Sequence, residues 1–281
     1  MADTSGQRAA TLQPFTFGGA AAFGDARVGR LLLVQLAVAL AAAAAIVWFV
    51  RAAWLPVVHD AIRALPDSGE IRHGRLHWPE AQPRLLARNR FLAIGVDLRH
   101  SGAIRSPSHV QVELGQGDIA FQSLLGYTSI AYPQSEWIVG VNRPALDPWW
   151  GAWRPPVLWI TFVTVTVALP LIWATLAAVL AGPAWLLAFF ADRRLTFLES
   201  WKVAGAAVLP GAVLMIAAIF GYGLGIIDLV QLLAALVLHL IVDVVYACAA
   251  PFFRPKAGSN SRRNPFAARN ASAENGPNRA S

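Results

Sequence analysis

The sequence predicts an α-helical multi-pass membrane protein with four transmembrane helices and a small extracytoplasmic α+β domain. Three observations predict this fold class. Four long stretches are apolar and almost uncharged, tryptophans gather near their ends, and a polar segment with strand-like runs separates the first two stretches. Composition agrees, because 56% of the residues are hydrophobic and only 14% are charged.

The four apolar stretches comprise residues 31–50, 157–181, 203–220 and 229–250. Each has about 18 to 25 residues, which at about 1.5 Å per residue is enough to cross a hydrocarbon core about 30 Å thick. The first is longer than the apolar core of a cleaved signal peptide, which has about 7 to 15 residues. We therefore interpret it as a retained signal anchor and assign residues 31–50 to transmembrane helix 1.

The second apolar run continues as far as Phe190, which is longer than one upright helix requires. Gly182 and Pro183 lie near its end, and this pair predicts a break in the helix. Residues 156–190 are therefore expected to form transmembrane helix 2 with an extension at the membrane interface. Residues 203–220 and 229–250 are expected to form transmembrane helices 3 and 4.

The positive charge, formally +7, lies mainly between and after the spans. Lys and Arg occur in the N-terminal segment 1–30, the link 191–202 and the tail 251–281, but not in the turn 221–228. Short basic segments remain cytoplasmic, whereas long translocated segments such as 51–155, which also contains Arg, largely escape this rule. The preference for Arg over Lys and the many alanines suggest a GC-rich bacterial genome. We therefore expect a bacterial inner-membrane protein with cytoplasmic N- and C-termini, and with residues 51–155 and 221–228 facing outward. This placement of charge is typical of topology and argues against a nucleic-acid partner. The polar tail is predicted to be disordered.

Residues 51–155 are long enough for one small domain. Residues 57–65 are predicted to form a helix that ends at Pro66, and 83–90 a second short helix. Gly, Pro and Asp separate the extended runs, which predicts a small antiparallel sheet with strands at 70–78, 91–98, 109–114, 118–123 and 127–132. Cys248, the only cysteine, lies in the fourth span, so the domain has no disulfide.

His239 and Asp243 form a candidate polar pair inside the fourth span. Their spacing of four residues places them on one helix face, where the side chains are expected to hydrogen-bond. Ionisable residues at this depth are costly and often functional. Two interpretations follow: a proton or ion relay in a transporter, or a structural pair that holds the helix against its neighbours. We favour the structural one, because the other spans carry no partner charge.

Two further motifs point to chemistry less strongly. His73 and His77 would share a strand face, and zinc would need a third ligand such as His59, His100 or His109. Gly115, Gly117 and Ala120 fit the spacing of a dinucleotide fingerprint, but a strand follows them rather than a helix. We interpret the histidines as surface residues and the glycines as a turn. The sequence predicts no catalytic residue, cofactor or metal site.

Three stretches carry a family resemblance: Leu65-Pro66 with residues 71–76 (IRHGRL), residues 91–97 (FLAIGVD) and residues 197–210 (FLESWKVAGAAVLP). In these stretches the chain resembles a family of bacterial four-span membrane proteins of unknown function with an extracytoplasmic domain after the first helix. The resemblance covers about residues 30–250 and implies the same architecture. It supplies no catalytic residues.

The expected role is binding or scaffolding in the cell envelope. The lipid bilayer is one partner, and an envelope protein or polymer is the expected partner of residues 51–155. The alternative is a transporter component that uses His239 and Asp243, and an enzyme is not expected because no convergent set of polar residues is present. The sequence does not indicate an oligomeric state.

Overall fold

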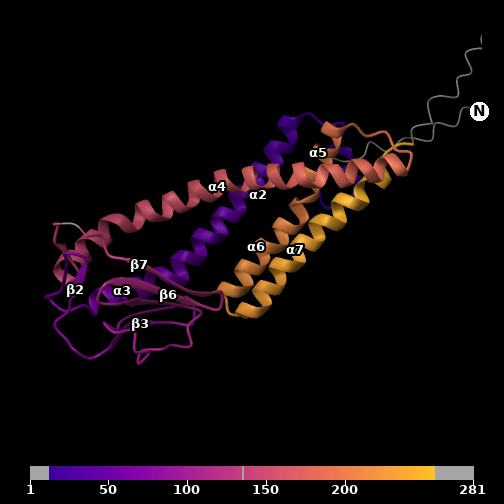
Figure 1. The fold of residues 1–281 in the computed structure, drawn as a ribbon. Coiled ribbons are helices and arrows are strands. Elements are labelled where there is room, and N and C mark those ends of the chain that lie inside the picture. Colours follow the sequence, from indigo (N-terminus) through magenta and orange to yellow (C-terminus); the bar gives the residue numbers. More distant parts are fainter. Residues whose placement is uncertain (1–12, 135, 257–281) are drawn as a thin grey trace, which may run out of the picture. The chain divides into compact units, whose positions relative to one another are not determined.

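The computed structural model describes residues 13–134 and 136–256. Within this part of the chain, four helical segments are long and apolar enough to cross a membrane: Val28–Arg63, Arg143–Phe190, Phe197–Gly223 and Leu229–Phe253. Figure 1 shows them together with the strands of residues 70–140. The described residues form two compact units. The helical unit contains residues up to 39, 168–215 and those from 235; the sheet unit contains 40–167 and 216–234.

The first long helix was predicted to end at residue 50, but it continues beyond that residue. Helix α2 (Val28–Phe49) continues through a π-helical turn, η1 (Val50–Trp54), into α3 (Leu55–Arg63). Pro56 lies in the first turn of α3 and has no backbone N–H, which explains why the α-helical ladder is interrupted there by a wider turn. The apolar helix therefore leads directly into the predicted outward domain.

The predicted break at Gly182 and Pro183 is wrong. Helix α4 runs without interruption from Arg143 to Phe190 (Figure 1). In apolar surroundings a broken helix would leave several backbone groups without partners, whereas proline removes only one hydrogen bond. Continuing the helix is therefore the less costly solution. Its first residues also lie inside the range that we assigned to the outward domain.

The third apolar segment is divided at a proline. Helix α5 (Phe197–Ala207) begins with a capping box in which Thr196 and Glu199 bond each other's backbone N–H groups. It ends one residue before α6 (Leu209–Gly223), and Pro210 in the first turn of α6 accounts for the division. Helix α7 (Leu229–Ala249) and the 3₁₀ turn η2 (Ala250–Phe253) complete the fourth segment.

Small side chains dominate the core of the helical unit. Ala39, Ala177, Ala204 and Ala207 are fully buried beside Trp173. Small residues permit helix backbones to approach closely, which favours association of apolar helices.

Residues near Asp25 contact Arg254, after α7, within the helical unit. Arg254 is 6% exposed and binds Asp25 through two hydrogen bonds of 2.5 and 2.8 Å. These bonds hold the pKa of Asp25 below its usual value. Lys202 is also buried and donates to the carbonyl of Ala26, near the short helix α1 (Phe17–Ala22). Basic residues that we interpreted as topology signals thus also connect elements. Residues 257–281 of the predicted disordered tail lie outside the described residues.

The sheet unit contains two sheets. One has the order β2-β1-β8 and the other β3-β4-β5-β6-β7. The first consists of β1 (Glu70–Arg72), β2 (Arg75–His77) and β8 (Val139–Gly140). The second consists of β3 (Arg84–Arg88), β4 (Leu92–Val96), β5 (Val110–Leu114), β6 (Asp118–Ser123) and β7 (Gly126–Ala131).

Three predictions about the sheets are wrong. The run 70–78, predicted as one strand, is divided into β1 and β2 by a turn at His73 and Gly74. The predicted helix at 83–90 is strand β3, which pairs with β4. The sheet is also not purely antiparallel, because β4 and β5 are parallel. Parallel neighbours need a long connection, and the loop 97–109 supplies one by returning the chain to the start of β4.

Two apolar clusters support the sheets. Leu55, Ile62 and Leu65 pack against Trp150 of α4. Leu76, Val96, Tyr132 and Val141 form the second cluster, between the two sheets. The sheet unit is thus supported by α3 and the first turns of α4 as well as by its own strands.

Candidate functional site

The loop 97–109 carries the most elaborate polar network in the sheet unit. It begins at Asp97, which is 1% exposed and directly follows β4. Its carboxylate accepts hydrogen bonds from the backbone N–H groups of Arg99 and Gly102 and from the hydroxyl of Ser101. Burial alone would raise the pKa of Asp97, but these donors outweigh it and hold the pKa below its usual value. Asp97 is therefore ionised, and its hydrogen bonds hold the start of the loop in place.

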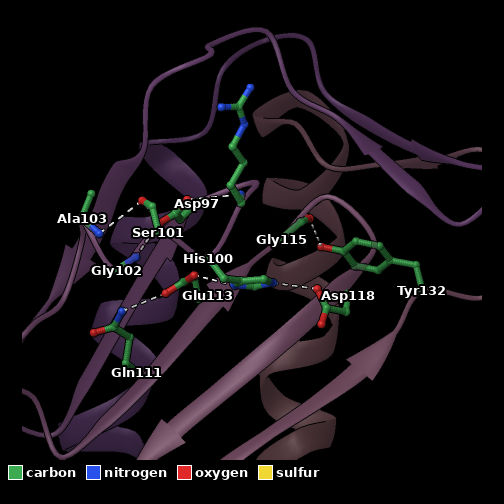
Figure 2. Close-up of polar contacts among 11 residues, drawn as sticks. Asp97, His100, Ser101, Gly102, Ala103, Gln111, Glu113, Gly115, Asp118 and Tyr132 are labelled. Carbon is green, nitrogen blue, oxygen red and sulfur yellow. Dashed lines mark hydrogen bonds and ion pairs between the residues drawn. The ribbon is translucent and has the colours of Figure 1, made fainter.

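This turn places His100 in the left-handed region, with φ of 50°. Figure 2 shows its ring between two carboxylates. Nδ1 lies 2.5 Å from Glu113 Oε1 of β5, and Nε2 lies 2.8 Å from Asp118 Oδ1 of β6. Glu113 is fully buried and also accepts a hydrogen bond from Gln111. One imidazole thus joins the loop to two adjacent strands.

The network favours a charged imidazole. Burial lowers the pKa of His100, but the hydrogen bonds to Asp118 and Glu113 outweigh it, and the pKa is raised above its ordinary value. Both ring nitrogens are occupied by carboxylates of this chain. A catalytic base needs a free nitrogen for substrate, which His100 lacks. The arrangement suits instead a pH-sensitive contact, the His100 contact with Glu113 and Asp118, that holds the loop on the sheet.

The turn between β5 and β6 passes close to the His100 ring. Gly115 faces His100, and a Cβ atom at this position would lie 2.2 Å from His100 Nε2. The Gly115 carbonyl accepts a hydrogen bond from the hydroxyl of Tyr132, whose pKa is raised by burial (Figure 2). Gly115 and Gly117 form a turn between strands, as predicted, rather than a dinucleotide loop.

The predicted pair His239 and Asp243 does not hydrogen-bond. His239 Nδ1 instead bonds the carbonyl of Leu236, 2.5 Å away in the preceding turn of α7. Asp243 is 2% exposed, and its Oδ1 has no hydrogen-bond partner in the described part of the chain. It packs against Gly211 of α6, where a Cβ atom would lie 2.1 Å from Oδ1. The same helix face therefore holds both residues without joining them.

The histidines considered as zinc ligands are dispersed. His77 lies in β2, whereas His73 occupies the preceding turn with φ of 49°, so the two do not share a strand. Among residues 13–134 and 136–256, no group of three His, Cys, Asp or Glu side chains has a geometry that could hold a metal ion.

His109 takes part in a different contact, at an aromatic junction formed by Phe49, Phe91, His109 and Tyr222. The rings of Phe49, Phe91 and His109 each contact Tyr222 at the C-terminal end of α6, and His109 Nδ1 shares a hydrogen bond with the Tyr222 hydroxyl. Arg90 lies over the rings of Phe91 and Tyr222 and donates to the carbonyl of Ile227 at 2.8 Å. Burial, followed by the charge of Arg90, lowers the pKa of His109. The junction attaches the five-stranded sheet to the turn between α6 and α7.

Sequence reasoning missed the roles of His100, Glu113 and Asp118. One signal was available. Gln111 and Glu113 alternate with Val110, Val112 and Leu114 in a single strand, so one face of β5 had to be polar. Because the five-stranded sheet buries this polar face, a partner such as His100 is needed to satisfy it.

Comparison with known proteins adds no identity. No protein-family model, curated protein or solved structure matches the chain.

Proposed function

We propose that this chain is a multi-pass protein of a bacterial inner membrane that binds or scaffolds an envelope partner through its outward-facing region. Four helices of sufficient length and apolarity support the membrane placement. The distribution of Lys and Arg supports cytoplasmic termini. The resemblance to bacterial four-span proteins agrees with this placement and remains a proposal. No catalytic residue or cofactor is assigned.

Reporter fusions test the topology. Fusions at Gly115 and Gly223 are expected to be periplasmic, and fusions at Thr196 and Asn260 cytoplasmic. A reporter that is active only in the periplasm and one that is active only in the cytoplasm should give opposite patterns. A cytoplasmic signal at Gly115 would contradict the proposed orientation.

The exposed edge strand β7 carries the binding proposal. All six residues of Gly126–Ala131 are exposed, and among the described strands β7 pairs only with β6. Tyr127 is 60% and Ile130 61% exposed, and Trp137 in the following segment is 82% exposed. An unpaired edge with large apolar side chains is a template for another extended chain. We infer that the partner is a protein segment that adds a strand beside β7.

The register of β6 and β7 identifies the backbone groups available for such pairing. Tyr132 donates its N–H to Gly117, and hydrogen-bonded residues alternate along an antiparallel pair. Thr128 and Ile130 therefore bond to β6. Tyr127, Ser129 and Ala131 direct their N–H groups away from the sheet, toward an added strand.

Photo-crosslinking in intact cells tests this proposal. A crosslinking residue at Thr128 should give a discrete adduct. Ser129→Pro should abolish it, because proline removes an outward N–H while leaving the bonds to β6 intact. Ser129→Ala keeps that N–H and should retain the adduct. A crosslinking residue at Arg88, on the opposite edge strand β3, serves as the position control. An adduct that survives Ser129→Pro would contradict strand addition.

A transporter component is the second candidate, and one observation favours it. Asp243 presents a buried carboxylate oxygen without a partner, inside a segment that we propose to be transmembrane. Ionisable residues in such segments often mark proton or ion pathways. However, a relay between His239 and Asp243 would need the two side chains in contact, and His239 bonds its own helix instead. The binding function therefore has the stronger support.

A further inference from the structure

A polar cavity lies beside the hairpin that joins β6 to β7. It has a volume of about 380 Å³, and its lining includes Arg105, His109, Gln122, Ser123, Leu124 and Leu229. A second cavity, of about 620 Å³, shares Arg105, Gln122 and Ser123 with the first. The two therefore form one depression that runs along the sheet from the first residue of α7.

The depression is suited to an anion. None of the described residues that line either cavity is Asp or Glu. Arg105 is exposed, and its guanidinium forms no ion pair with a carboxylate among the described residues. The carboxylates of Glu113 and Asp118, on the strands below, are held by His100. Arg105 is thus free to bind a ligand, and guanidinium groups bind phosphate through paired hydrogen bonds.

The loop around Arg105 is already ordered for binding. The backbone N–H of Ser106 donates to Gln111 at 2.9 Å, and the hydroxyls of Ser106 and Ser108 lie 3.0 Å apart. Ser108 also donates to the carbonyl of Asn89. A preformed loop loses little conformational freedom when a ligand binds, which favours affinity.

The surroundings of the cavity are apolar and exposed. Leu124 and Leu125 form the tip of the hairpin and are 63% and 86% exposed. Leu224 and Ile226, in the turn between α6 and α7, are 64% and 74% exposed. Leu229 connects the two features, because it begins α7 and lines the cavity. A polar cavity next to exposed leucines at the end of an apolar helix matches the boundary between headgroups and acyl chains.

We propose that this depression binds the phosphate of an anionic phospholipid, with Arg105 as the principal contact and the leucine tip inserted among the acyl chains. This inference rests on the proposed membrane placement and does not require the protein partner at β7, although Gly126 and Tyr127 of that strand also line the second cavity. Lipid binding would hold the sheet at the membrane surface.

Native mass spectrometry of the purified full chain in detergent tests the proposal. The chain is titrated with dioleoyl phosphatidylglycerol, dioleoyl phosphatidylcholine or glycerol 3-phosphate. Phosphatidylglycerol should bind most tightly. Arg105→Gln should weaken that binding about tenfold, as expected for loss of one charge-assisted contact. Arg75→Gln, which removes a charge from β2 in the other sheet, should bind as the wild type does.

Each contrary outcome has a definite meaning. Equal affinity of Arg105→Gln and wild type for phosphatidylglycerol would overturn the proposal. Binding of glycerol 3-phosphate as tight as that of the lipid would identify a soluble phosphate compound as the ligand and reject the lipid. Because the titration uses purified protein, its failure is distinguishable from failure of the topology fusions or of the crosslinking at β7.

Discussion

Gly115 and His100 lie so close that the backbone of one residue determines the position of the other. A Cβ atom at Gly115 would approach His100 Nε2 to 2.2 Å and Asp118 Oδ1 to 2.6 Å. The glycine is therefore required by space. It lets the turn between β5 and β6 pass beneath the imidazole that holds the loop 97–109.

The first prediction follows from this contact. Gly115→Ala should separate His100 from Asp118 and lower the stability of the sheet unit by about 1 to 3 kcal/mol, as overpacking does elsewhere. Gly117→Ala in the same turn is the matched control, because nothing lies within 4 Å of a Cβ atom there. Hydrogen exchange of residues 91–132 in the full chain should increase in the first variant and not in the second. Equal exchange in both would refute the steric argument.

The second prediction concerns pH. The pKa of His100 is raised in the folded state, so its contribution to stability is fully present below the unfolded value of about 6.5. That contribution is lost as the pH rises through the folded pKa. The loop 97–109 should therefore exchange hydrogen faster, relative to the rest of the sheet unit, as the pH is raised from about 6 to 9. In His100→Asn, where the residue tolerates positive φ but does not titrate, this change should be absent. A pH profile unaffected by the substitution would assign the change to another group.

The elements that the sequence predicts best are those that local composition or turn residues decide. Four apolar runs of membrane-spanning length became four long helices. Strand β6 occupies the predicted residues 118–123, because glycines mark the turn before and after it. The helix predicted at 57–65 is α3, shifted by two residues. Local composition and the Gly and Pro residues between elements determine where these helices and strands lie, without help from distant contacts.

The wrong predictions arise where distant contacts decide. Residues 84–88 have no strict alternation and become a strand only because β4 offers an edge. The continuation of α4 through Pro183 depends on the cost of unpaired backbone groups, which no local pattern reports.

The side-chain contacts of the candidate site could not be predicted from the sequence for a similar reason. Spacing in the sequence placed His239 and Asp243 on one helix face but could not show that α6 would present Gly211 to the aspartate. His100, Glu113 and Asp118 are separated in sequence and meet only because the loop 97–109 folds over the sheet. Side-chain partners of this kind follow from topology, and the parallel pairing of β4 and β5 was not predicted.

The third prediction separates the two candidate functions at Asp243. Asp243→Asn should preserve protein abundance, because the amide has nearly the same shape and costs less to bury than a carboxylate. Asp243→Leu should lower abundance, because a bulkier side chain meets Gly211. Protein level and cellular phenotype are measured in the same cells. Lost phenotype at normal abundance in the Asn variant would favour ion or proton transport over scaffolding.

The fourth prediction tests the packing between α6 and α7. Gly211→Ala should destabilise the helical unit by about 1 to 3 kcal/mol, because the added Cβ atom would lie 2.1 Å from Asp243 Oδ1 and 2.8 Å from the His239 carbonyl. Gly182→Ala is the matched control. It adds the same methyl group to helix α4, where nothing lies within 4 Å, and should stabilise the chain by about 0.5 to 1 kcal/mol.

A double variant identifies which contact matters. Asp243→Ala removes the carboxylate that the new methyl group would strike, but it leaves the His239 carbonyl in place. Thermal unfolding of Gly211→Ala with Asp243→Ala should therefore show partial recovery relative to the sum of the single variants, because residues in contact do not behave additively. Full additivity would mean that Gly211 and Asp243 do not pack against each other. Complete recovery would mean that the carboxylate alone requires glycine at this position.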